Sequence, residues 1–130
     1  MPYRSKPDHR DGTNLKSQWT ILYNQEVASF DLATREDWSS GATTRWGLHM
    51  NPAPGNLGQS ASAFGTPTRP LFIAKFIDGD ANDLWHGYPA DPYRNQHDIP
   101  PSSVLRAWNS ATHLRPAVIR KLVKGQLCTL

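Results

Sequence analysis

The eleven prolines of this 130-residue chain restrict where regular secondary structure can form. Proline lacks a backbone N–H and fixes its own φ angle, so it is excluded from helix interiors and from central strands. Two segments, residues 51–70 and 89–101, hold four prolines each and are predicted to be loops. Helices and strands must therefore lie before, between and after them, and the length fits one domain with its own core.

The clearest strand prediction follows the first of these proline-rich segments. Residues 71–77 are apolar except for Lys75 and are rich in aromatic and β-branched side chains. A polar turn over 78–83 then leads into 84–88, which is predicted to return as the second arm of a hairpin. Residues 43–50 are also rich in strand formers. We therefore predict a small antiparallel sheet of about three strands, built from residues 43–50, 70–77 and 84–88.

A helix is predicted before this sheet, over residues 17–33. Trp19, Val27 and Phe30 recur at helical spacing along it, which favours one apolar helix face. A strand stays open as an alternative at its start, because residues 19–23 also alternate between apolar and polar side chains.

Two amphipathic helices are predicted at the C-terminus. Pro116 suits the first turn of the second helix, and Gly125 is a suitable residue to end it. The predicted apolar stripes are Val104, Leu105, Trp108 and Ala111 in the first helix and Val118, Ile119, Leu122 and Val123 in the second. The predicted fold class is therefore α+β, a small antiparallel sheet with an N-terminal helix and a C-terminal helical hairpin.

The remaining segments complete the predicted domain organisation. Residues 1–16 are charged and lack an apolar period, so they are expected to form a flexible arm before a single domain over 17–130. Residues 51–70 are expected to be a long mobile loop, with Phe64 almost its only large apolar side chain. Residues 34–41 resemble a capping box followed by a glycine stop, which predicts a further short helix.

The charges of the chain are unevenly distributed along it. Residues 99–130 contain five basic side chains and no acidic one, whereas residues 17–98 contain nine acidic residues and five basic ones. A surface of one sign attracts polyanions, so nucleic acid is the first expected partner. The predicted nucleic-acid-binding residues are Arg106, Arg115, Arg120, Lys121 and Lys124, with Arg4, Lys6 and Arg10 as additional contacts.

The two C-terminal helices have the proportions of a helix-turn-helix unit. The twelve residues from Leu114 to Gly125 resemble the recognition-helix half of phage-repressor-like DNA-binding domains, through Leu114, Ile119, Leu122 and Gly125. Asn109 and His113 depart from that family, which usually has a small residue and a glycine there. The resemblance implies that the basic residues of the second helix contact phosphates or base edges. The alternative is a helical hairpin that caps the sheet, with a merely solvated basic face.

A second function class is suggested by reactive side chains between residues 85 and 98. His86, Arg94, His97 and Asp98 are the candidate catalytic residues of a small metal-independent ribonuclease, similar in size and charge to toxin-like enzymes. One imidazole would accept the proton of the attacking 2′-hydroxyl, the other would protonate the leaving oxygen, and Arg94 would stabilise the phosphorane charge. The alternative is structural, with His86 bonded to a loop carbonyl and Asp98 capping the helix that begins near Pro101.

A third class is a non-catalytic protein-interaction module or inhibitor. The five tryptophans and the proline-rich loops fit this class, because interfaces favour Trp, Tyr and Arg. Residues 51–70 would then be the segment that contacts another protein.

The sequence predicts no metal or cofactor site and no membrane contact. One cysteine, Cys128, and five scattered histidines show none of the paired spacings of zinc sites. Residues 78–83 fit only the first half of a calcium loop and are better explained as a hairpin turn. No apolar run is long enough to span a membrane and no signal peptide is recognised, so a cytoplasmic location is expected.

Overall fold

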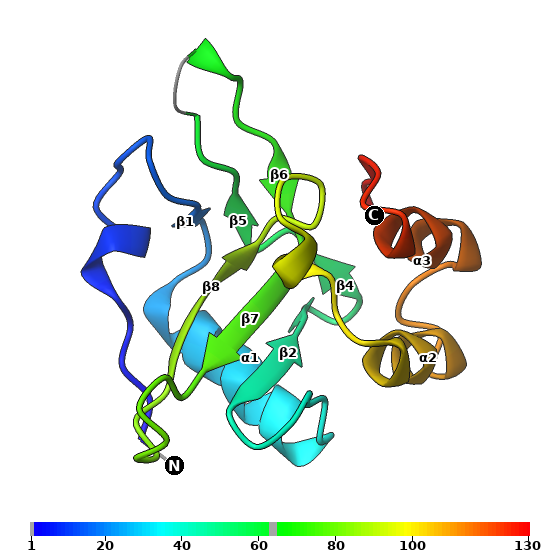
Figure 1. Cartoon of the computed structure of the whole chain (residues 1–130), viewed down its shortest axis with the longest axis horizontal. Helices are drawn as coiled ribbons and strands as arrows, with labels where there is room; N and C mark the ends of the chain where they lie inside the picture. The colour runs from blue at the N-terminus through cyan, green and yellow to red at the C-terminus, as the bar shows by residue number, and fades with distance from the viewer. Residues whose placement is uncertain (1, 63–64) are drawn as a thin grey trace.

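The structure, a computed structural model, describes residues 2–62 and 65–130 and has an α+β fold (Figure 1). Its central sheet contains β2 (Thr44–Gly47), β7 (Ile73–Ile77) and β8 (His86–Ala90) in the order β2-β7-β8, with both pairings antiparallel. These are the three strands predicted from the sequence. Because β8 is an edge strand, Pro89 reduces its stability only slightly. The strand therefore continues two residues into the segment that was predicted to be a loop.

Shorter strands complete the β structure, two of them at the ends of the predicted strands 43–50 and 70–77, which break at residues 48 and 72. A second antiparallel sheet has the order β1-β5-β6, from β1 (Gln18–Trp19), β5 (Gly58–Gln59) and β6 (Pro70–Leu71). A two-stranded pair joins β3 (His49–Met50) to β4 (Pro54–Gly55). Residues 51–62 are therefore not structureless, and Leu57 between β4 and β5 is fully buried. Phe64 lies outside the described residues, and the mobility of 51–70 stays a prediction.

The N-terminal helix α1 (Tyr23–Arg35) starts later than the sequence predicted. Gln18 and Trp19 pair with β5 instead, so only Trp19 of the alternative strand over 19–23 lies in a strand, and Tyr23 already belongs to α1. The side-chain carbonyl of Gln25 accepts a hydrogen bond from the backbone N–H of Leu22, which anchors the first turn. The predicted short helix over 34–41 is wrong, because Asp37 adopts a left-handed backbone (φ 54°) immediately after α1.

Helix α1 packs on one face of the central sheet (Figure 1). Phe30 of α1 and Phe76 of β7 meet there, with ring centroids 5.3 Å apart. Phe76 is fully buried, and its ring lies over two glycines of the neighbouring strands. A Cβ at Gly87 would be 2.3 Å from Cδ1 of Phe76, and one at Gly47 would be 2.8 Å from its Cε2. The two glycines therefore provide the space that this ring needs between the sheet and α1.

The C-terminal hairpin consists of α2 (Ser102–Ser110) and α3 (Pro116–Val123), and the two helices contact each other beside the sheet (Figure 1). Trp108 is fully buried and meets the ring of Trp38 edge to face, with centroids 5.6 Å apart. The predicted stripes are buried at Val104, Leu105, Trp108, Val118 and Leu122 and half-buried at Ile119. Ala111 and Val123 are exposed, because each lies at the end of its helix, beyond the packed surface.

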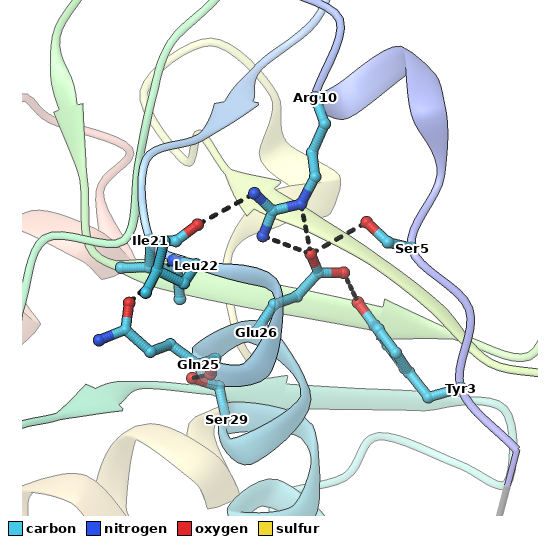
Figure 2. A network of polar contacts seen from close by, with 8 residues as sticks. All are labelled: Tyr3, Ser5, Arg10, Ile21, Leu22, Gln25, Glu26 and Ser29. Carbon is cyan, nitrogen blue, oxygen red and sulfur yellow. Dashed lines mark hydrogen bonds and ion pairs between the residues drawn. The ribbon is translucent and has the colours of Figure 1, made fainter.

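The N-terminal segment folds back onto the domain. Tyr3 forms a β-bridge with Trp85, and the short 3₁₀ helix η1 (Pro7–His9) follows it. Figure 2 shows Tyr3, Ser5 and Arg10 converging on the carboxylate of Glu26, which is fully buried in α1. Arg10 also donates to the carbonyl of Ile21 at 3.0 Å. The segment predicted as an arm thus contributes to the buried contacts of the domain, whereas its flexibility stays a prediction.

Candidate functional site

The five cations predicted to bind nucleic acid all have exposed side chains on the C-terminal hairpin. Arg106 lies in α2 and Arg115 is the N-cap of α3. Arg120 and Lys121 occupy the last turn of α3, and Lys124 is its C-cap. We call Arg106, Arg115, Arg120, Lys121 and Lys124 the basic tail surface.

The basic tail surface is not neutralised by the acidic middle of the chain. The ion pairs in residues 2–62 and 65–130 are Arg10–Glu26, Lys16–Asp8, Arg69–Asp91 and Lys75–Asp98, all outside residues 99–130. At 100° per residue, Arg120 and Lys124 project from the side of α3 opposite to Val118 and Leu122, which are buried. The apolar stripe of the helix therefore directs these charges toward solvent.

The predicted turn between the two helices is present. It spans residues 111–115 and includes Thr112, which has a left-handed backbone at φ 58°. His113, at a position where the repressor-like family has glycine, packs edge to face against Trp38 at 5.8 Å. The hairpin is thus fixed to the core at its turn as well as along both helices.

The four predicted catalytic residues do not share one pocket. Arg94 and Asp98 line a pocket of about 390 Å³ beside β8, whereas His86 lines an adjoining pocket of about 350 Å³. His97 lines neither of these pockets, and its backbone carbonyl accepts a hydrogen bond from Nζ of Lys75 at 2.6 Å. His97 lies in the 3₁₀ helix η3 (Gln96–Asp98), where its side chain is exposed.

Asp98 is buried and makes several structural contacts. It accepts hydrogen bonds from the hydroxyl of Tyr88 at 2.8 Å and from the backbone N–H of Asp91 at 2.9 Å. Nζ of Lys75 lies 3.9 Å from the same carboxylate. Burial, and then the neighbouring Asp98, raise the pKa of Tyr88 above its ordinary value. Asp98 therefore joins β8 to η3 and makes no cap contact with α2.

His86 has a polar atom without a partner. Its Nδ1 is buried and makes no hydrogen bond within the described residues, so the loop-carbonyl contact considered from the sequence is not formed. The proposed catalytic role of His86 stays a prediction.

His9, for which the sequence pattern predicts no role, lines both pockets. Its ring is buried and stacks on Tyr88, with centroids 5.3 Å apart and planes 17° apart. Nδ1 of His9 lies 2.8 Å from the carbonyl oxygen of Ser17, a contact that requires the proton on Nδ1. His9, Lys16 and Tyr88 line both pockets. No sequence signal identified His9, because it lies in a segment without apolar periodicity.

In the part of the chain that the structure describes, no three His, Cys, Asp or Glu side chains are grouped so that they could hold a metal ion. Within the same residues, none of the helices has the length and apolar character needed to cross a bilayer. No protein-family model, curated protein or solved structure shows a significant match to this chain.

Proposed function

We propose that the protein binds nucleic acid through the basic tail surface. The observation that supports this proposal is the exposure of all five cations of residues 99–130, in a segment with no acidic side chain. Phosphates of a nucleic-acid backbone bind Lys and Arg largely without regard to sequence, and binding releases condensed counterions. The proposed interaction is therefore electrostatic and sequence-tolerant, with α3 as its main element.

The arm residues add little to this surface. The guanidinium of Arg10 is engaged by Glu26 and by the carbonyl of Ile21, so it is not available to a phosphate. Arg4 and Lys6 are exposed but lie in the N-terminal segment, away from α2 and α3 (Figure 1). We therefore assign binding to the C-terminal hairpin alone.

Fluorescence anisotropy tests the proposal with a random labelled duplex and a random labelled single strand, titrated at several salt concentrations. For duplex DNA we expect log K to fall linearly with log salt concentration, with a slope of about −0.9 for each phosphate contact. Substituting Arg120→Ala and Lys124→Ala together is expected to make the duplex slope shallower by about 2 units, because two contacts are lost.

A charge-matched control separates a local surface from the overall charge. The double variant Arg4→Ala/Arg35→Ala also removes two exposed cations, both outside the hairpin. It is expected to bind both nucleic acids as the wild type does. A wild-type affinity that does not change with salt, or equal losses in the two double variants, would contradict the proposal.

A further inference from the structure

The larger of the two pockets lies between the N-terminal segment and the end of β8. His9, Lys16 and Ser17 form one side, and Tyr88, Arg94 and Asn95 line the other. Its volume of about 390 Å³ is within the range of small-molecule sites. Figure 2 shows the adjacent Arg10 bonded to Glu26 of α1, a contact that anchors the N-terminal segment to which His9 belongs.

The two carboxylates in the pocket wall are both neutralised by protein groups. Asp91 forms an ion pair with Arg69, whose Nη2 lies 2.6 Å from Oδ2, whereas its Oδ1 is buried and has no hydrogen-bond partner among the described residues. Asp98 is engaged by Tyr88, by the N–H of Asp91 and by Lys75. These contacts leave the pocket with the positive charge of its two exposed cations, Lys16 and Arg94.

The remaining polar groups of the pocket are mainly donors. The guanidinium of Arg94 has no ion-pair partner within the described residues, and Lys16 has only a 3.8 Å contact with the half-exposed Asp8. The carbonyl oxygen of the Asn95 side chain accepts from the N–H of His97, so its amide nitrogen is left to donate. Because Nδ1 of His9 donates to the carbonyl oxygen of Ser17, Nε2 of the neutral ring is an acceptor and does not belong to these donors.

We infer that this pocket binds the phosphate group of a small organic phosphate monoester. A phosphate dianion matches two cations, because an Arg fork can bond two of its oxygens while a Lys neutralises the remaining charge. The volume exceeds what one phosphate needs, so it also accommodates part of an organic group. In the adjoining pocket Asp80 has no ion-pair partner among the described residues, so that pocket is the less favourable one for an anion.

This inference is independent of the proposed nucleic-acid binding. No residue of the basic tail surface lines the pocket, and none of the pocket residues lies in α2 or α3. The two surfaces can therefore be tested with separate variants in the same full-length chain.

The test is an NMR titration of the ¹⁵N-labelled protein, with inorganic phosphate, ribose 5-phosphate and adenosine 5′-monophosphate as the phosphate probes and adenosine as the uncharged probe. We expect saturable shifts for the phosphate probes, centred on the backbone amides of Arg94 and Asn95 and on the ring nitrogens of His9. An organic phosphate is expected to bind more tightly than inorganic phosphate, because the rest of the pocket then contributes. Adenosine is expected to cause no such shifts.

The variant Lys16→Ala/Arg94→Ala removes two exposed cations without touching the core. It is expected to weaken binding of the organic phosphates by about tenfold or more, because two charge-assisted contacts are lost. Arg120→Ala/Lys124→Ala serves as the charge-matched control and is expected to bind them as the wild type does. Absence of saturable shifts with every phosphate, equal binding of adenosine and its monophosphate, or undiminished binding by the pocket variant would overturn the inference.

Discussion

Arg10 donates two hydrogen bonds to a single oxygen of Glu26, from Nε at 3.0 Å and from Nη2 at 2.8 Å. Glu26 is fully buried and its carboxylate also accepts from Tyr3 and Ser5 (Figure 2). A buried ion pair of this kind is costly to break from one side, because the remaining charge stays desolvated. The contact therefore makes the position of the N-terminal segment depend on one residue of α1.

Removing this arginine should reduce stability strongly. Arg10→Ala is expected to lower the free energy of unfolding by about 3 kcal/mol, since Glu26 loses its cationic partner. The double variant Arg10→Ala/Glu26→Gln should recover part of that loss, because it buries no unpaired charge. Urea unfolding followed by tryptophan fluorescence measures both values. Lys16→Ala is the control, because its partner Asp8 is 3.8 Å away and both side chains are half exposed, so this ion pair contributes little to stability. An equal loss of stability in Lys16→Ala and Arg10→Ala would contradict this account.

Gly87 should not tolerate a side chain. A Cβ there would be 2.3 Å from Phe76 and 2.8 Å from the hydroxyl of Tyr3, so Gly87→Ala is expected to destabilise the fold by about 2 kcal/mol or more. Gly79→Ala is the matched control, because a Cβ at Gly79 meets no heavy atom within 4 Å. We expect it to change stability by no more than about 1 kcal/mol, in the stabilising direction. Thermal unfolding of the two variants tests the difference, and similar melting temperatures would argue against the close fit of Phe76.

Alkaline pH should destabilise the protein through Tyr3. Burial, and then the hydrogen bond to Glu26, raise the pKa of Tyr3 above its ordinary value of about 10. The stabilisation that Tyr3 provides is therefore complete below pH ~10 and declines above it. In that higher pH range the unfolded chain loses the phenolic proton of Tyr3, whereas the folded chain keeps it. Each such tyrosine contributes a slope of about 1.4 kcal/mol per pH unit.

The variant Tyr3→Phe should be less stable than the wild type at pH 7 and should lose stability less steeply above pH 10. Urea unfolding at pH 7, 9, 10 and 11 measures the two slopes, and the lysines contribute equally to both proteins. Parallel curves above pH 10 would show that Tyr3 ionises equally well in the folded state.

Cys128 should react slowly with alkylating agents. Burial raises the pKa of its thiol, and the charge of Lys121 opposes that shift. Only the thiolate is nucleophilic, so iodoacetamide at pH 8 should modify Cys128 more slowly than a free cysteine in solution. Lys121→Ala should slow the reaction further, because it removes the charge that favours the thiolate. Mass spectrometry of timed samples measures both rates, and faster modification in the variant would contradict this electrostatic assignment.

The parts of the fold that the sequence predicted are those with a local pattern. Strand β7 follows from an apolar run after Pro70, and α2 and α3 follow from stripes such as Val104, Leu105 and Trp108. The same periodicity predicted that Arg120 and Lys124 face solvent, since a buried stripe fixes the opposite face of a helix. Binding of a polyanion by those cations stays a prediction.

The parts that the sequence did not predict depend on contacts between distant residues. Strands β1 and β5 have two residues each, too few to show an alternation of apolar and polar side chains. They form because β5 pairs with β1 on one side and with β6 on the other. Leu57 is fully buried although its neighbours are typical of a loop. The late start of α1 has the same origin, because Gln18 and Trp19 pair with β5 and tryptophan is itself enriched in strands.

The sequence by itself determined the α+β class, the central sheet, the two C-terminal helices and the solvent-facing side of their charges, because side-chain periodicity over a few turns or strand residues specifies these features. Only the tertiary structure decided that residues 2–16 pack on the domain, that His9 stacks on Tyr88, and that His86 and His97 line no common pocket among the two beside β8. The packing of the N-terminal segment depends on the buried charge of Glu26 and on pairings such as Tyr3 with Trp85. These contacts join residues far apart in the chain, so no local sequence pattern predicts them.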